Sequence, residues 1–356
     1  MTLLVKTTIA SSIRKASTLL AVVGTSALSF SSLSAHAAGE VNVYSARAEA
    51  LIAPLLDNFS KENDVKVNLI TGDADALLSR LQSEGSASPA DVFITVDAGR
   101  LYRAKDAGVL QAFETDKLKE VVPSHLQDRD GYWYGLSQRA RVFLYNPETV
   151  NPAELSTYED LADPKWKGKI CIRSSGNIYN QSLVASMIDA HGEAKTLEWI
   201  KGLVANFARP PAGGDTDQIK AAAAGVCDIA IANTYYFGRL GQSEKQEERD
   251  VYNKLVMFWP NQGANERGVH VNVSGIGMTA SAKNKENATK LVEFLTNQQS
   301  QAWYAEVNNE YPVVEGIAPP KNLTVFGDFK ADQVSLSVLG ENNRQAVKLM
   351  DQGGWK

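Results

Sequence analysis

The chain has 356 residues, of which 44% are hydrophobic, with 36 basic and 41 acidic side chains. This length is sufficient for two domains that each bury a core of their own. The acidic balance, without any clustered basic footprint, argues against nucleic acid as a partner.

Residues 1–37 are expected to be an export signal rather than part of the fold. Lys6, Arg14 and Lys15 form a basic region, a short apolar segment without charge follows, and Ala35 and Ala37 belong to a small-residue cleavage signal. No cysteine lies at this position, which argues against a lipoprotein anchor. Removing the segment leaves 33 of the 36 basic residues against all 41 acidic ones, a net charge of −8. We therefore expect a soluble protein of the periplasm, cleaved near Ala37.

Strand and helix patterns alternate from the start of the predicted mature chain. Strands are predicted at 41–46, 65–72 and 90–97, and helices at 51–59 and 73–85. This βαβα order predicts a mostly parallel sheet that helices cover on both faces.

A second unit of the same kind is predicted in the middle of the chain. Its strands are expected at 139–146, 169–175 and 226–233, its helices at 182–190, 193–207 and 217–225, and a strand-rich segment at 268–280 leads into a helix at 284–297. The charged run at 244–250 is expected to be a solvated helix face.

The chain is expected to cross between two α/β lobes near Arg139 and again near Gly275. These crossings assign residues 38–138 plus 271–313 to an N-terminal lobe and residues 139–270 plus 314–356 to a C-terminal lobe. Two α/β lobes joined by strand crossovers, in an exported protein, are typical of hinged periplasmic binding proteins. Ligands of such proteins lie between the lobes, near the carboxyl ends of strands.

Signals for an enzyme are weak. The predicted mature chain has three histidines, His125, His191 and His270, in separate regions, and shows no nucleophile elbow, phosphate-binding loop or zinc-type cluster. We therefore expect a binding protein rather than an enzyme.

The two cysteines, Cys171 and Cys227, lie in separate strand-like runs, and each precedes a tyrosine by eight residues. They are either two small buried hydrophobic residues or, in an exported protein, a disulfide between neighbouring strands. Because the intervals are equal, adjacent parallel strands would bring the two cysteines side by side. We predict a disulfide that helps to hold the two tyrosine-bearing units in register.

Three tyrosines follow two of the predicted strands. Tyr235 and Tyr236 come directly after the strand at 226–233, in the first turn of a helix that Asn233 or Thr234 would cap. Arg239 is spaced to share their side of that helix. Tyr179 falls in the first turn of the helix after the strand at 169–175. The pattern therefore delivers three phenols to one rim of one lobe.

Three phenol oxygens at one rim of a lobe indicate a binding site for a hard metal cation. A free tyrosine has a pKa of about 10, so a phenolate at neutral pH needs a strong positive charge nearby. A trivalent cation provides that charge and prefers oxygen ligands, which favours ferric iron. A small anion would complete the coordination, held by Arg239 and the helix N-termini. The alternative interpretation is that the tyrosines are packing residues.

The sequence resembles the bacterial periplasmic ferric-iron-binding proteins, the transferrin-like receptors of ABC iron importers. The resemblance covers nearly all of the mature chain, including the stretches VNVYSARAEALIAPLLDNF, LSQRARVFLYN, ANTYYFGRL and HVNVSGIGMTA. It implies a type 2 periplasmic-binding-protein fold, Fe3+ as the ligand and a synergistic anion such as carbonate. It implies iron-ligand roles for Tyr235 and Tyr236, and for Tyr179 as in members with a third tyrosine. Arg139 and Arg239 would be anion-binding or charge-balancing residues.

The sequence departs from many relatives in the N-terminal lobe. The positions where those relatives place a histidine, or a histidine and a tyrosine, are Ala48 and Glu49 here, and the position of a glutamate ligand in others is Val96. The N-terminal lobe therefore lacks the usual protein ligands, and Glu49 is a candidate substitute ligand. The resemblance then implies the subgroup in which the tyrosines and an anion bind the metal.

The expected function is that of a monomeric periplasmic receptor that binds ferric iron and delivers it to an inner-membrane ABC permease. One alternative is a receptor for a polyamine, a sugar or thiamine, in which the tyrosines are stacking walls of the site. Another is an exported hydrolase or other enzyme, against which the missing nucleophile and base count.

Overall fold

The computed structural model describes residues 39–356, so the predicted signal peptide lies outside the described residues. Among the helices of this part, none combines the length and the apolar character that a membrane span needs. Residues 38–356 form one unit.

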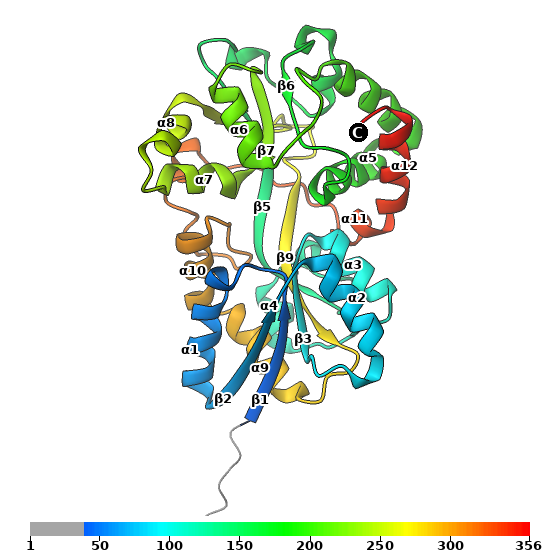
Figure 1. Cartoon of the computed structure of the whole chain (residues 1–356), viewed down its shortest axis with the longest axis vertical. Helices are drawn as coiled ribbons and strands as arrows, with labels where there is room; N and C mark the ends of the chain where they lie inside the picture. Colours follow the sequence, from blue (N-terminus) through cyan, green and yellow to red (C-terminus); the bar gives the residue numbers. More distant parts are fainter. Residues whose placement is uncertain (1–38) are drawn as a thin grey trace, which may run out of the picture. The chain divides into compact units, whose positions relative to one another are not determined.

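A single sheet of nine strands runs through the molecule in the order β2-β1-β3-β9-β5-β7-β6, with β4 paired to β9 and β8 paired to β5 (Figure 1). The strands are β1 (Gly39–Ser45), β2 (Val65–Thr71), β3 (Val92–Val96), β4 (Leu110–Gln111), β5 (Tyr134–Tyr145), β6 (Ile170–Cys171), β7 (Ile229–Asn233), β8 (Val256–Phe258) and β9 (Val271–Thr279). Strand β1 is parallel to β2 and β3, and β6 is parallel to β7, whereas β5 and β9 run antiparallel to their neighbours. The parallel pairs within each lobe are present, but the prediction of a mostly parallel sheet was wrong: the sheet is mixed, because β5 and β9 run antiparallel to every strand they pair with.

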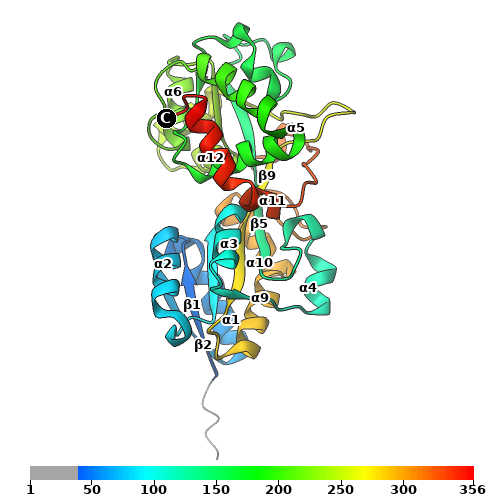
Figure 2. The same ribbon diagram turned by 90° about the vertical axis from the view of Figure 1, so that its right-hand side faces the viewer.

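The α-helices lie between and beside these strands. They are α1 (Ala53–Asn63), α2 (Ala74–Glu84), α3 (Ala98–Asp106), α4 (Asp116–Val121), α5 (Ile178–Ala205), α6 (Asp215–Ala223), α7 (Thr234–Gln242), α8 (Gln246–Lys254), α9 (Lys285–Leu295), α10 (Gln298–Asn308), α11 (Ser337–Glu341) and α12 (Asn343–Gln352). In both ribbon views α2 and α3 cover one face of the β1–β3 sheet and α1 and α9 cover the other (Figures 1 and 2). We call the half around β1–β4 the N-terminal lobe and the half around β6–β8 the C-terminal lobe.

Strands β5 and β9 connect the two lobes. Residues Tyr134–Ala140 of β5 pair with β9, and from Arg141 onward the same strand pairs with β7. Strand β9 in turn pairs with β3. At Gly275 an added Cβ atom would lie 2.7 Å from the carbonyl oxygen of Tyr134, so the close approach of β5 and β9 requires glycine there. The exact division of the chain into lobes at residues 138, 270 and 313 stays a prediction.

The region 178–205 differs from the sequence prediction of two separate helices. The structure has one element, α5, which is interrupted by non-helical backbone at Gly192, with φ of 77°. Glycine adopts positive φ at little cost, so the two helical segments follow each other without a loop. The charged run at 244–250 falls mainly on the exposed first half of α8, as predicted.

Candidate metal centre

Strand β7 and helix α7 position Tyr235 and Tyr236. All five residues of β7 are buried, and α7 begins at Thr234 directly after it, so the two tyrosines are its second and third residues. Asn233 is the N-cap residue by backbone position, but its side-chain oxygen accepts a hydrogen bond from Arg141 at 3.0 Å and makes no cap bond. The first N–H groups of α7 therefore have no side-chain cap.

Strand β6 and helix α5 position Tyr179 in the same way. Asn177 is the N-cap residue of α5, and its side chain accepts a hydrogen bond from the backbone N–H of Tyr179 at 3.2 Å. The side chain of Asn180 accepts from Arg141 at 2.6 Å and donates to the carbonyl of Arg173 at 2.8 Å. The buried Arg141 guanidinium thus links the starts of α5 and α7.

The two βα units bring the three phenols together. The hydroxyl oxygens of Tyr179 and Tyr235 are 3.2 Å apart, and the rings of Tyr235 and Tyr236 lie with centroids 4.2 Å apart. Tyr235 is 7% exposed, and the other two rings are half-buried. The convergence of the phenols that the sequence pattern indicates is therefore present in the structure.

Burial keeps the phenols of Tyr235 and Tyr236 protonated when no metal is bound. It raises the pKa of Tyr236 to about 12, and the neighbouring Tyr179 and Asp215 act in the same direction. Burial is also the main reason why the pKa of Tyr235 lies well above its ordinary value, against the opposing charge of Arg139. Only a nearby cation of high charge could hold these groups as phenolates at neutral pH.

The phenols line one small hollow, of about 160 Å³, which we call the tyrosine hollow. It is lined by Ala46, Arg47, Ala48, Leu51, Val96, Tyr179, Tyr235, Tyr236, Arg239 and Glu310. Pockets for organic ligands usually measure about 300–1,000 Å³, so this hollow fits an ion with a small anion better than a sugar or thiamine. Ala48 and Val96 lie in its wall, whereas Glu49 is exposed and is not one of the lining residues.

The two predicted anion-binding arginines occupy different places. Arg239 lines the hollow, and its guanidinium lies 4.9 Å from the centroid of the Tyr235 ring. Arg139 is only 2% exposed and lies beside Tyr179, 5.6 Å from its ring centroid. Its Nη1 donates to Ser274 at 3.0 Å, while its Nε and Nη2 are buried without a partner. Two unpartnered donors on a buried cation are suited to an anion.

Sequence reasoning missed Arg47 and Glu310, which form a buried ion pair of 3.0 Å in the wall of the hollow. Arg47 follows β1, so its place at the carboxyl end of a strand is a signal that could have been used. Glu310 follows α10 and is far from every other site residue in sequence, so no pattern indicated it. Within residues 39–356, no group of three His, Cys, Asp or Glu side chains could hold a metal ion, which leaves the phenols as the clustered oxygen donors.

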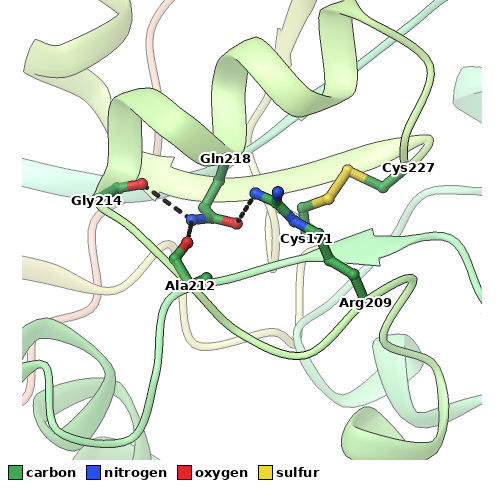
Figure 3. The surroundings of a disulfide bond; sticks show 6 residues. All are labelled: Cys171, Arg209, Ala212, Gly214, Gln218 and Cys227. Carbon is green, nitrogen blue, oxygen red and sulfur yellow. Dashed lines mark hydrogen bonds between the residues drawn. A yellow bond between two sulfur atoms is a disulfide. The ribbon is translucent and has the colours of Figure 1, made fainter.

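Cys171 and Cys227 form a disulfide in the structure, with Cα atoms 5.9 Å apart (Figure 3). The expected register was wrong, because Cys171 pairs with Ala230 and Cys227 lies in the turn before β7. The N–H groups of Asp228 and Ile229 both bond to the carbonyl of Lys169, so the chain bulges there before the strand begins. The bridge therefore joins the end of β6 to the residues before β7, whereas Tyr235 and Tyr236 follow the far end of β7.

Beside the disulfide, Gln218 of α6 fixes the loop that leads into this helix (Figure 3). Its amide donates to the carbonyls of Ala212 and Gly214, and its oxygen accepts from Arg209 at 3.2 Å. Helix α6 begins at the buried Asp215, which accepts a hydrogen bond from the backbone N–H of Asn233 at 2.8 Å. Asp215, at the end of this loop, thus holds Asn233, the N-cap residue of α7.

The family model of bacterial extracellular solute-binding proteins matches residues 55–331. The chain belongs to this family of receptors and has its two-lobe α/β solute-binding fold.

Several proteins of known name are similar to the chain over most of its length. Iron uptake protein A1 of Synechocystis sp. is 50% identical over 317 residues, covering 89% of this chain and 88% of that protein. The Fe(3+)-binding periplasmic protein of Serratia marcescens is 31% identical, covering 92% and 94%. The structure of a Trichodesmium protein in complex with iron and citrate matches with a TM-score of 0.87 at 53% identity, covering 89% of this chain and 100% of that one.

Proposed function

We propose that this chain is a periplasmic receptor that binds ferric iron through the phenolates of Tyr179, Tyr235 and Tyr236. The observation that carries the proposal is the convergence of these phenols from two helix N-termini, with hydroxyl oxygens of Tyr179 and Tyr235 3.2 Å apart. Three phenolates balance the charge of Fe3+, and hard oxygen ligands suit this ion. The iron-related names of the relatives support the same cargo.

The proposal includes a small anion, carbonate or another oxyanion, that completes the coordination. Arg239 in the wall of the hollow and the unpartnered donors of Arg139 behind Tyr179 support it. The uncapped N–H groups at the start of α7 add a favourable dipole. An inner-membrane ABC permease would then recognise the iron-loaded protein, which would act as a monomer. Movement of the two lobes relative to each other would be the signal.

The competing cargoes are organic molecules stacked on the tyrosines. The small volume of the hollow and the two arginines near it oppose a cationic polyamine, because like charges would meet there. An enzymatic role would need a nucleophile and a base, and the polar groups that line the hollow are phenols, guanidinium ions and one carboxylate, Glu310, which is held by Arg47.

The test is a visible spectrum with metal analysis of the purified protein, before and after addition of ferric iron with bicarbonate. We expect a charge-transfer band from phenolate to iron and close to one iron per chain. A colourless protein that takes up no iron but is stabilised by a polyamine, a sugar or thiamine would overturn the proposal.

A further inference from the structure

The wall of the tyrosine hollow on the side of the N-terminal lobe contains a buried ion pair. Arg47 Nη1 lies 3.0 Å from Glu310 Oε2, and the two side chains are only 2% and 4% exposed. Both residues line the hollow, next to Ala48 and Val96, which cannot bind a metal. Burying two charged side chains costs free energy unless they are paired and hydrogen-bonded.

The pair leaves part of Arg47 unused. Its Nε is buried and has no hydrogen-bond partner, whereas its Nη1 is held by the carboxylate. The Ser137 hydroxyl donates to the same oxygen of Glu310, so this carboxylate is fixed from two sides. An unpartnered buried N–H on a cation is costly, so Arg47 has donor capacity beside the hollow that its carboxylate partner does not use.

Glu310 is placed to stay ionised. Burial alone would raise its pKa, but Arg47, Arg139 and the Ser137 hydroxyl hold the pKa of this carboxyl below its ordinary value. Its negative charge compensates Arg47 and restrains the guanidinium. Glu310 itself is anchored between the preceding residue Asn309, which donates to Gln242 of α7 at 2.7 Å, and Tyr311, which pairs with Gln138 of β5.

The remaining charges around the hollow favour an anion. Within the described part of the chain, Glu310 is paired with Arg47, and Asp215 is paired with Arg141 and Arg173. Arg139 and Arg239 have no carboxylate in ion-pair contact there, so a positive excess remains after the three phenolates have balanced Fe3+. Arg47, whose charge Glu310 compensates, contributes N–H donors rather than net charge to the wall on the side of the N-terminal lobe.

We propose that Arg47 is the N-terminal lobe's contact with the oxyanion that accompanies the metal, and that Glu310 is the residue that positions it. The inference rests on the proposed function. It means that this lobe engages the cargo through the anion rather than through a metal ligand. The anion would then be held from both lobes, by Arg47 on one side and by Arg239 of α7 on the other.

The experiment measures how strongly ferric iron is retained against a chelator with carbonate, with citrate and with neither anion. Removing Arg47 alone would leave Glu310 buried and unpaired, which can unfold the protein. The central variant is therefore the double Arg47→Gln/Glu310→Gln, which removes both charges and keeps the size of the side chains. Melting temperature verifies that it is folded.

A matched control exists in the same lobe. Arg80 pairs with Glu84 at 2.6 Å and lies 4.8 Å from the ring centroid of Tyr44, so Arg80→Gln makes the same chemical change away from the hollow. In the double variant we expect the anion to increase iron retention about 10-fold less, or weaker still, than in the wild type. This fold-change corresponds to the loss of one charge-assisted contact. Arg80→Gln should keep the full gain.

Two further variants separate contact from positioning. Arg47→Lys keeps the charge without the planar fork and should restore only part of the anion effect. Replacing carbonate by citrate should shift the colour band of the wild type, and this shift should be smaller in Glu310→Gln. The position of the band does not depend on the stability of the fold. An effect of one anion but not the other would identify which oxyanion Arg47 serves.

The outcomes separate the two proposals. A wild-type protein that loads iron, beside a folded double variant whose retention responds to both anions as strongly as wild type, would overturn the inference alone. A wild-type protein that takes up no ferric iron would overturn the proposed function and the inference with it.

Discussion

The hydroxyl oxygens of Tyr179 and Tyr235 lie 3.2 Å apart although 56 residues separate them in the chain. Each tyrosine is the second residue of a helix that follows a strand, and the two strands, β6 and β7, are parallel neighbours. Parallel strands end at the same edge of a sheet, so the two helix starts lie together. A pair of phenols in contact, with burial that keeps Tyr235 neutral, is a site that only a strong cation can ionise.

The first prediction concerns the ligand oxygens. Tyr235→Phe, Tyr236→Phe and Tyr179→Phe each remove one oxygen and keep the ring, so packing should change little. We expect each change to shift the colour band and to weaken iron binding. The loss should exceed the roughly 10–100-fold that removal of a residue supporting a metal ligand costs, because here the ligand itself is removed. Tyr145→Phe, in buried strand β5, is the control. Full colour and full iron content in all three variants would make the tyrosines packing residues.

The second prediction concerns pH. The pKa values of Tyr235 and Tyr236 are raised in the metal-free protein, so both are protonated at every pH near neutral and must lose a proton on binding. Iron affinity should therefore fall with falling pH by at least about 100-fold per pH unit, which is the contribution of the two protons of Tyr235 and Tyr236. Calorimetry in buffers of different ionisation enthalpy counts the released protons. Retention that is unchanged between pH 7.5 and pH 6 would argue against phenolate ligands.

The third prediction concerns Arg139, whose charge lowers the pKa of Tyr235. Arg139→Met should weaken iron and anion together, by about 10- to 100-fold for a lost charge-assisted contact. Without that charge the pKa of Tyr235 rises further, so the pH at which half the iron is retained should move upward. Arg239→Ala is expected to weaken iron and anion together as well. Loss of iron affinity with unchanged anion dependence would contradict the assigned role of Arg139.

The fourth prediction concerns the disulfide, which closes a chain separation of 56 residues. Cys171→Ser with Cys227→Ser should lower the free energy of unfolding by about 4 kcal/mol on the loop-entropy relation. Because the bridge lies before β7 and the tyrosines lie after it, we expect iron affinity of the folded variant to change less than 10-fold. Chemical denaturation and iron titration measure the two effects separately. A much larger loss of affinity would show that the bridge does set the tyrosine register.

The fifth prediction concerns Glu49, the candidate ligand of the N-terminal lobe. It is exposed and does not line the hollow, so Glu49→Gln should leave iron retention and the colour band unchanged. Val96→Ile, a conservative change in the wall, should also preserve binding, because this position supplies no ligand. A lost or shifted band in Glu49→Gln would assign a ligand role to this residue.

The βα units and the site tyrosines could be predicted because their signals are local. A buried apolar strand followed by a helix start places Tyr179 and Tyr235 in a first helical turn, and both signals lie within a few residues of each tyrosine. The pairing of Arg47 with Glu310 could not be predicted, since it joins residues 263 positions apart. The same limit explains the wrong cysteine register: the bulge at Asp228 depends on hydrogen bonds to Lys169. Helices α3, α4, α10, α11 and α12 were not predicted.

Strand β5 changes its pairing partner between Ala140 and Arg141, one residue after Arg139. Arg139 also reaches across to Ser274 of β9, the other strand that joins the lobes. The proposed anion site and the strand crossover between the lobes therefore share the same few peptide units. A cargo that engages this guanidinium would contact the crossover directly, so cargo binding and the geometry of the lobes would be coupled at one place.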